Sequence, residues 1–379
     1  MHIILDDNDQ HLTFAPLSLT RPIGNLRMGI FTNDERYKQL LPAAKVSFAT
    51  EDYIQSVFPL ELASDNIWVN AAVIPNKQFI DAIINLESTT ALYQNGVFLA
   101  GRNHQKLFEQ KKAFSGDITL LTERWHLFQW NDKVLRADFE LIPKTTATLS
   151  NSNKLIGNAD QIFVHPSAKV EGAIINVNEG PVYIGPNAEI MEGTLVRGPL
   201  ALCDDATLKM GAKIYGATTI GPHCKVGGEI NNVIFQSYSN KGHDGFLGNT
   251  VIGECCNLGA DTNTSNLKNN YGTVKAFDYL EKKLAATGVQ FMGLMMGDHA
   301  KAGINTMFNT ATVVGVAANV FNAGFPPKFI PDFAWGGFDD TLYDFDKAME
   351  AAENMMQRRN VPLSESYKAM LFHLFKQRK

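Results

Sequence analysis

Aliphatic side chains recur at every sixth position through the middle of the chain. Eight consecutive positions carry them at this interval: Ile184, Ile190, Val196, Leu202, Leu208, Ile214, Ile220 and Val226. An α-helix repeats about every 3.6 residues and a β-strand every two, so neither element explains this period. A prism whose flat sides each take six residues does explain it, with one aliphatic side chain pointing inward from each side. The sequence therefore predicts a left-handed parallel β-helix built from hexapeptide repeats.

The same phase sets the limits of this solenoid, which we expect over residues 155–330. Inward positions also occur at both ends of that range: Val164, Val170, Met296, Ala302, Phe308, Val314 and Val320. Interruptions at residues 174–181 and 265–290 predict loops that leave the coil, and such loops often carry binding sites. The open ends and flat sides of a solenoid favour self-association, with a homotrimer as the expected assembly.

The regions on either side of the solenoid lack the period. Residues 1–150 predict a shortened α/β domain, with strands at residues 1–5 and 66–73 and a helix at residues 76–86. A polar stretch at residues 142–153 is expected to link this domain to the solenoid. Residues 331–379 predict a helical extension that packs against the solenoid, and the prolines at 326, 327 and 331 are expected to end the β-ladder.

Composition narrows the function to small-molecule chemistry. No run approaches the roughly 20 apolar residues of a membrane span, so no membrane role is expected. The net charge is −5 and the basic residues are scattered along the sequence, so no basic cluster indicates binding to nucleic acid. The four cysteines include no C-x-x-C pair, which argues against a zinc site and favours free thiols in the cytoplasm. The N-terminus is interpreted as a first strand and not as a signal peptide.

Polar residues gather in one part of the solenoid. They run from Asn240 to Asn249, continue through residues 257–262 and end at Asn266. With these residues the chain resembles the acetyltransferase half of bifunctional glucosamine-1-phosphate acetyltransferase/N-acetylglucosamine-1-phosphate uridylyltransferases. That family carries Gly-His, Leu-Gly, Ile-Gly, Asn-aliphatic-Gly-Ala and a later Asn. Here the intervals from His243 to Asn257 and Asn266 agree with that pattern.

The resemblance implies acetyl-CoA as acyl donor and an amino sugar phosphate as acceptor. Such a sugar arrives largely as an ammonium and must lose a proton before it can attack a thioester. A histidine with a pKa near 6.5 is the usual base for that step, and the resemblance assigns it to His243. It assigns Asn257 and Asn266 to substrate binding, because amides supply both donors and acceptors. The alternative is that His243 caps a coil and the asparagines form turn ladders.

Several positions depart from the family pattern. Phe246 stands where the family usually has a substrate-binding tyrosine, Asp261 replaces a glycine, and Asn231 occupies the place of a phosphate-binding lysine. We still include Phe246 among the substrate-binding candidates, and the acceptor is expected to differ from the family's own. Lys275 could supply a cation to the substrate, or it could be a solvated loop lysine.

The N-terminal domain resembles a shortened sugar nucleotidyltransferase. Residues 14–22 stand in the place of that family's signature loop, and the resemblance implies that Arg21 and Arg27 face phosphates. The family's glycine-rich turn is absent, because the first glycine of this chain is Gly24. Asn70-Ala71 stands where the family has a Gly-Asp metal motif, so Mg²⁺ is considered for this domain only and no metal-ligating residue is assigned.

Three functions from different classes are compatible with these residues. The first, ranked highest, is acetyl-CoA-dependent N-acyl transfer to an amino sugar 1-phosphate. The second is nucleotidyl transfer from a nucleoside triphosphate to a sugar 1-phosphate, with the solenoid serving assembly. The third is a protein that binds a sugar nucleotide without catalysis.

Overall fold

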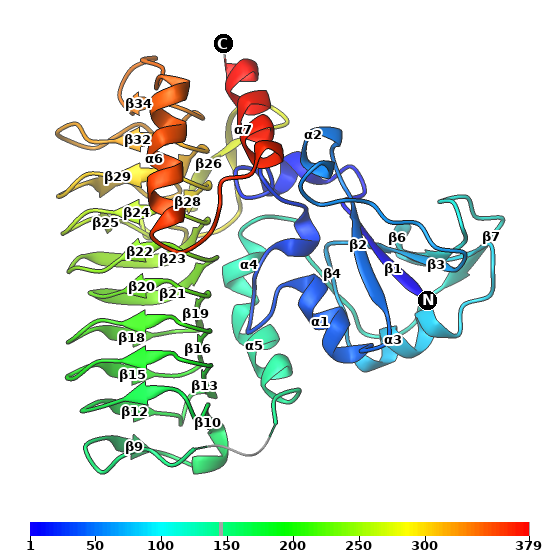
Figure 1. Cartoon of the computed structure of the whole chain (residues 1–379), viewed down its shortest axis with the longest axis horizontal. Helices are drawn as coiled ribbons and strands as arrows, with labels where there is room; N and C mark the ends of the chain where they lie inside the picture. The colour runs from blue at the N-terminus through cyan, green and yellow to red at the C-terminus, as the bar shows by residue number, and fades with distance from the viewer. Residues whose placement is uncertain (144–146, 379) are drawn as a thin grey trace.

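The computed structural model describes residues 1–143 and 147–378, so residues 144–146 of the expected linker lie outside the described residues. Figure 1 shows an α/β domain lying beside a tall solenoid, with two C-terminal helices against one end of the solenoid. The predicted fold class is thus confirmed: an α/β N-terminal domain, a parallel β-helix and a short C-terminal helical segment. Among the described residues, no helix is long and apolar enough to cross a membrane.

One mixed sheet forms the centre of the N-terminal domain. Its strands lie in the order β2 (Lys45–Ala49), β1 (His2–Asp6), β3 (Asn66–Asn70), β6 (Val97–Arg102), β5 (Thr90–Gln94) and β7 (Gln110–Ala113). β1 is parallel to both β2 and β3, and β6 is antiparallel to β3. The single strand predicted at residues 66–73 is two strands, because the chain turns after Asn70 and only then forms β4 (Val73–Ile74).

The remaining elements of this domain are short. They are the 3-10 helices η1 (His11–Phe14) and η2 (Ile23–Asn25), strand β8 (Thr119–Leu120), and helices α1 (Asn33–Leu40), α2 (Asp52–Gln55), α3 (Lys77–Ile84), α4 (His126–Gln129) and α5 (Asn131–Phe139). α3 is the helix predicted at residues 76–86, and it begins where the Asn76 side chain accepts a hydrogen bond from the Phe79 amide.

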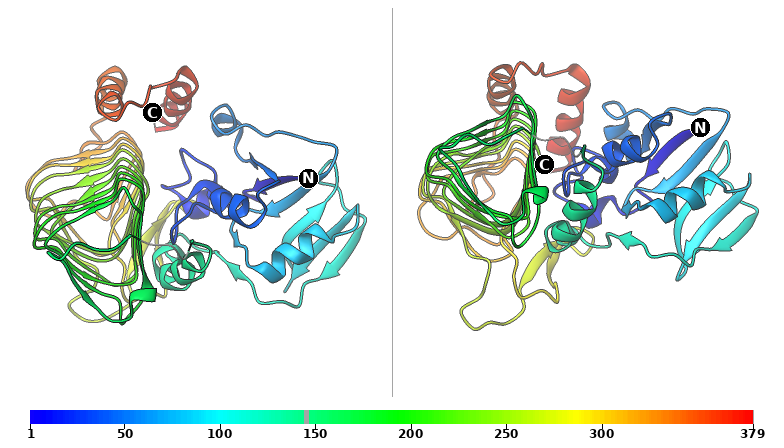
Figure 2. Two further views of the ribbon diagram at one scale, coloured as in Figure 1. Left: turned by 60° about the horizontal axis from the view of Figure 1, so that its bottom comes forward. Right: turned by 90° about the horizontal axis from the view of Figure 1, so that it is seen from below.

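The solenoid has three flat faces, visible when it is viewed from one end (Figure 2). Face A contains β10 (Ile162–Val164), β13 (Val182–Ile184), β16 (Leu200–Leu202), β19 (Thr218–Ile220), the second halves of β21 (Glu229–Phe235) and β23 (Phe246–Ile252), β28 (Met295–Met296), β31 (Val313–Val314) and β33 (Phe329–Ile330). Face B contains β11 (Lys169–Val170), β14 (Glu189–Ile190), β17 (Thr207–Leu208), β20 (Lys225–Val226), β22 (Asn240–Lys241), β24 (Asn257–Leu258), β29 (Lys301–Ala302), β32 (Asn319–Val320) and β34 (Trp335–Gly336).

Face C completes the prism. It contains β9 (Lys154–Ile156), β12 (Ile174–Asn176), β15 (Leu195–Arg197), β18 (Lys213–Tyr215), the first halves of β21 and β23, β25 (Asn263–Thr264) and β30 (Met307–Phe308), after the 3-10 helix η3 (Ala159–Gln161). The eight aliphatic side chains that define the period are all at most 3% exposed, so their predicted inward orientation is confirmed. Stacking these side chains removes a continuous apolar column from water.

The period changes just before the polar cluster. After Val226 the next inward residue is Ile230, only four residues on, and Phe235 follows after five, because β21 runs through the corner between faces C and A. The next inward position belongs to a lysine, Lys241, before Leu247 restores the apolar series. The coil that precedes His243 is therefore shorter than its neighbours.

The prediction that prolines end the ladder after residue 320 is wrong. β33 pairs with β31 and β34 pairs with β32, so the solenoid continues to Gly336. Pro326 and Pro327 lie in the loop before β33, and Pro331 lies at the corner after it, where no ladder N–H is required. The loop predicted at 174–181 likewise begins later, because residues 174–176 form β12.

Two segments join the solenoid to its neighbours. The long excursion at residues 265–290 folds into an antiparallel hairpin of β26 (Lys275–Asp278) and β27 (Lys283–Ala286), whose Val274 and Ala276 join the apolar core of the N-terminal domain. The C-terminal helices are α6 (Phe345–Gln357) and α7 (Glu365–Arg378). Leu371 and Phe375 of α7 share a buried apolar cluster with Val316 and Phe333 of the solenoid, and the rings of Phe333 and Phe375 are in contact. The C-terminal extension therefore packs against the solenoid, as the sequence predicts.

Candidate functional site

A basic groove lies between face B of the solenoid and the C-terminal end of α6. It has a volume of about 750 Å³. Its cationic lining residues are Lys209, Lys225, Lys301, Arg358 and Arg359, and His243 and Asn257 line it as well. No aspartate or glutamate is among the described residues that line it. Such an excess of positive charge suits a ligand that carries phosphate groups.

Two glycines, Gly242 and Gly259, line the floor of the groove. On face B the residue after the inward side chain is glycine in four successive coils, at Gly227, Gly242, Gly259 and Gly303. A Cβ atom on Gly259 would lie 2.5 Å from the carbonyl carbon of Gly303, so the coils stack too closely there for a side chain. A Cβ atom on Gly242 would meet nothing within 4 Å and would project into open space. Gly242 and Gly259 therefore leave bare backbone at the bottom of the groove.

The register of the β-ladder builds one wall. Lys225 pairs with Asn240, Asn240 with Asn257, and Asn257 with Lys301, so their outward side chains form one row. Arg359, which lies two residues after α6 ends, donates from Nη2 to Asn240 Oδ1 at 2.8 Å. This hydrogen bond connects the opposite wall of the groove to the row on face B. Burial lowers the pKa of Lys301, whose Nζ donates to the carbonyl of His299 at 3.0 Å.

His243 lies at the corner that leads from face B to face C. Its side chain is exposed, and no described residue hydrogen-bonds its ring nitrogens. The Asn257 side chain is exposed on β24, and it lines the same groove as His243. The structure thus brings together two of the residues that the sequence selected, and leaves both free to contact a ligand.

Phe246 and Asn266 lie elsewhere, over Gly248 of β23. A Cβ atom on Gly248 would fall 2.7 Å from Cζ of Phe246 and 2.5 Å from Nδ2 of Asn266, so both side chains cover this glycine. Asn266 also donates from Nδ2 to Asn249 Oδ1 at 2.7 Å. Neither residue lines the basic groove, and Lys275, exposed on the hairpin strand β26, does not line it either. The predicted substrate-binding residues are therefore divided between separate places.

Arg21 lies in the interface between the N-terminal domain and the solenoid. Its Nη2 is 2.6 Å from Asp298 Oδ2 and 2.8 Å from Glu254 Oε2, and both carboxylates belong to the solenoid. Thr20 donates to the same Asp298 oxygen at 2.7 Å. The side chain of Arg21 is 5% exposed. Because two carboxylates already neutralise this guanidinium, its geometry gives no support to the expected phosphate contact.

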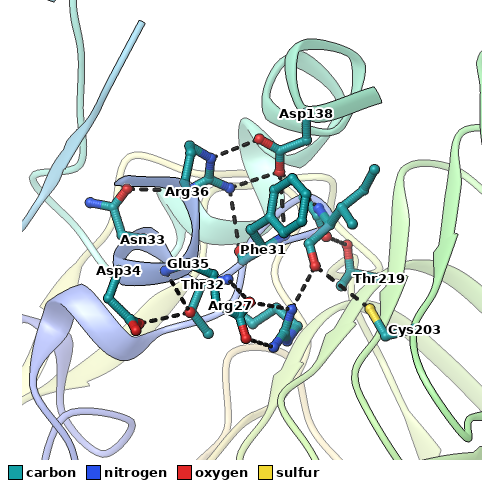
Figure 3. Close-up of polar contacts among 12 residues, drawn as sticks. Arg27, Phe31, Thr32, Asn33, Asp34, Glu35, Arg36, Asp138, Cys203 and Thr219 are labelled. Carbon is teal, nitrogen blue, oxygen red and sulfur yellow. Dashed lines mark hydrogen bonds and ion pairs between the residues drawn. The ribbon is translucent and has the colours of Figure 1, made fainter. Parts of the chain in front are cut away.

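Arg27 belongs to a second buried cluster at this interface (Figure 3). It pairs with Glu35 at 3.1 Å, and its backbone N–H donates to the Gln236 side chain of the solenoid at 2.7 Å. Nearby, the buried pair of Arg36 and Asp138 joins α1 to α5 at 2.7 Å. The loop that resembles a nucleotide-binding signature thus serves to dock one domain on the other, and the geometry does not favour a phosphate contact at Arg27 either.

The residues at the carboxyl ends of the parallel strands do not fit Mg²⁺. Asn70 uses both ends of its amide, donating to the Phe98 carbonyl at 3.2 Å and accepting from the Ala72 amide at 3.0 Å. Asp6 is paired with Lys106 at 2.7 Å. Burial raises the pKa of Asp7 to about 7, which weakens it as an anionic ligand. Among the described residues, no three His, Cys, Asp or Glu side chains gather as a metal site.

Sequence reasoning missed most of the groove. Lys225 and Lys301 could have been found, because each directly precedes an inward residue of face B and so must point outward. Arg358 and Arg359 carry no such signal, since only the path of the chain after β34 places the end of α6 over face B.

Fold and groove together define a hexapeptide-repeat β-helix protein with an N-terminal α/β domain and a basic groove beneath a C-terminal helix. Residues 2–146 match the family model described as sugar nucleotidyl transferase. The chain is similar to bifunctional sugar-1-phosphate nucleotidyltransferase/acetyltransferases, in agreement with the resemblance seen in its sequence.

Individual relatives match only parts of the chain. The bifunctional protein GlmU of Synechococcus elongatus is 24% identical over 217 residues, which cover 54% of this chain and 42% of that protein. A bifunctional sugar-1-phosphate nucleotidylyltransferase/acetyltransferase of Sulfurisphaera tokodaii is 26% identical over 38% of this chain and 36% of its own length. A hexapeptide transferase family structure from Anaplasma phagocytophilum aligns with 58% of this chain and 92% of that chain, at 16% identity and a TM-score of 0.19.

Proposed function

We propose that this chain transfers an acyl group from acetyl-CoA to the amine of a phosphorylated amino sugar, inside the basic groove. The observation that carries the proposal is the meeting of His243 and Asn257 with five cationic side chains in one cleft. Phosphates of either substrate would find partners among the lysines and arginines, because charge-assisted hydrogen bonds to phosphate are the strong ones. The amide of Asn257 would orient the sugar.

His243 would act as the general base. A ring nitrogen of His243 takes a proton from the substrate ammonium, and the freed amine attacks the thioester carbonyl carbon. A C–N bond forms, the attacking nitrogen loses its second proton, and the C–S bond breaks. The coenzyme A thiolate takes up that second proton and leaves as the thiol, and His243 releases the first proton to solvent. The exposed position of the imidazole leaves it accessible to the substrate, and a histidine is suited to proton transfer near neutral pH.

Nucleotidyl transfer is the second candidate, favoured by the family match of residues 2–146. We rank it lower because Arg21 and Arg27 are used in the domain interface and the strand ends do not fit Mg²⁺. A role for this domain in docking and in binding a sugar nucleotide is compatible with the same contacts. Binding without catalysis is the third candidate for the whole chain.

The decisive experiment follows free thiol while the purified chain is incubated with acetyl-CoA and a panel of hexosamine 1-phosphates. Thiol release that His243→Ala abolishes would support the proposal. The matched control is His165→Ala, a histidine at another corner that hydrogen-bonds Ser167, and it should retain the wild-type rate. Wild-type activity in His243→Ala would overturn the assignment of the base. Pyrophosphate release from nucleoside triphosphates with Mg²⁺, without thiol release, would move the activity to residues 2–146.

We also propose that the chain works as a homotrimer in the cytoplasm. Ile174 and Leu195 are register partners on face C and are 41% and 47% exposed, so face C offers apolar surface to another copy. Light scattering of the purified chain would measure the assembly, and a monomer at micromolar concentration would contradict it.

A further inference from the structure

Lys241 occupies a position that the fold reserves for apolar side chains. It points inward from face B, in register with the buried Val226 of the preceding coil, and it is 0% exposed. Lysine is rarely fully buried without a partner, because removing an ammonium from water is costly. Burial lowers the pKa of this amine to about 8. A specific set of contacts must therefore compensate for its position.

The Lys241 ammonium is held by the corner that carries His243. Its Nζ donates to the backbone carbonyl oxygens of His243 and Asp244, each at 2.6 Å. The Asp244 carbonyl also accepts from the amide of Asp261 in the next coil at 2.9 Å. The side chain thus passes through the interior of the coil and fastens the corner from within. The charged groups facing the ammonium are the carboxylates of Asp244 and Asp261.

The shape of the corner explains why it needs an internal support. Gly245 adopts φ of +119°, and a Cβ atom there would lie 2.3 Å from the Thr262 carbonyl oxygen and 3.1 Å from Nζ. An apolar side chain at position 241 could not donate to the two carbonyls that point inward. The His243 carbonyl would lose its lysine donor, and the Asp244 carbonyl would keep only the amide of Asp261. Because a carbonyl that faces the interior without a donor destabilises a fold, the corner would relax toward a conformation that exposes the His243 carbonyl to water.

We propose that Lys241 is a positioning residue for His243, holding the corner of residues 242–245 so that the imidazole faces the basic groove. The inference rests on the proposed function for the role of His243, whereas the support of the corner is a property of the fold itself. Lys241 does not line the groove, so its effect on a ligand would pass through the backbone of its neighbours.

The test replaces Lys241 with methionine, which is unbranched and only one atom shorter than lysine but has no donor. Hydrogen exchange followed by mass spectrometry should show amides of residues 243–246 and Asp261 exchanging about tenfold faster or more. The matched control is Lys169→Met, an exposed lysine on the same face, which should leave this exchange unchanged. In the thiol-release assay, Lys241→Met should lower kcat about 10- to 100-fold, with KM for acetyl-CoA within about twofold, because small misplacements of a base are costly.

A second variant keeps the test decisive if Lys241→Met fails to fold. Lys241→Gln retains an N–H donor without the charge, and it should give exchange and kcat between wild type and Lys241→Met. Unchanged exchange at residues 243–246 in a folded variant of either kind would overturn the positioning role. If exchange is faster in Lys241→Met but His243→Ala keeps full activity, Lys241 supports the corner and His243 is not the base.

Discussion

The guanidinium of Arg21 lies 2.6 Å from the carboxylate of Asp298, across the boundary between the N-terminal domain and the solenoid. Both side chains are at most 5% exposed, and Glu254 adds a second carboxylate at 2.8 Å. A buried charge without its partner is far less stable than a buried pair. This contact therefore makes the two domains depend on each other for stability.

Replacing Arg21 with methionine should lower the free energy of unfolding by about 3–5 kcal/mol, because the buried carboxylate of Asp298 and the partly exposed carboxylate of Glu254 lose their counter-ion. Chemical denaturation followed by circular dichroism would measure the loss. Arg197→Met is the control, since Arg197 pairs with Glu179 at 3.3 Å but is 58% exposed. Its effect should stay at about 1 kcal/mol or less. Equal effects of the two substitutions would show that the buried pair does not stabilise the interface.

The solenoid could be predicted from the sequence because its period is local. Each coil needs one inward aliphatic side chain per face, so Ile184 and its seven successors mark the fold without any long-range information. The shortened coil could not be predicted in this way. In that coil β21 runs straight through a corner, so the interval between inward residues falls below six. Lys241 also stands where the pattern requires an aliphatic residue.

The candidate site was predictable only in part. His243 and Asn257 were selected through motif spacing, and the structure places both in one groove. Arg21 was selected in the same way, but the charge that makes arginine suitable for phosphate also suits a buried carboxylate. Its actual partner, Asp298, is 277 residues away in the chain, and only the docking of the domains reveals the pair.

Asp7 predicts a dependence of stability on pH. Burial raises the pKa of its carboxyl group from 3.8 to about 7, so the folded state binds a proton more tightly than the unfolded chain does. The contribution of Asp7 to the free energy of unfolding is therefore greatest below about pH 4. It declines as the pH rises toward 7, by about 4 kcal/mol at most. Melting temperatures of Asp7→Asn should show a weaker decline between pH 5 and 8 than the wild type.

Asp9→Asn is the control for this titration, because Asp9 is exposed and two residues away. Its melting temperature should follow the wild-type pH profile. If Asp7→Asn kept the full wild-type slope, the buried carboxyl would not be its source, and another group would have to bind the proton.

The charge of the groove predicts how strongly it should bind phosphorylated ligands. Lys225→Glu reverses one charge on the groove wall and should weaken acetyl-CoA binding about tenfold, equal to about 1.4 kcal/mol. Isothermal titration calorimetry at two salt concentrations would measure the dissociation constant and its salt dependence, which the substitution should reduce. Lys213→Glu, an exposed lysine on face C, is the control and should bind as the wild type does. If both variants weakened acetyl-CoA binding equally, the net charge of the protein would be the cause, and the position of Lys225 in the groove would not matter.

Two glycines of the groove floor predict opposite outcomes for the same substitution. In Gly259→Ala the new methyl group would lie 2.5 Å from backbone atoms of Gly303 and Ile304, so the stacked coils must move apart and the melting temperature should fall by several degrees. In Gly242→Ala the methyl group meets nothing within 4 Å, so the melting temperature should stay unchanged. That methyl group would instead project into the groove beside His243, and calorimetry should show acetyl-CoA binding weakened several-fold. Unaltered binding in Gly242→Ala would place the ligand away from this floor, and unaltered stability in Gly259→Ala would contradict the close stacking of the coils.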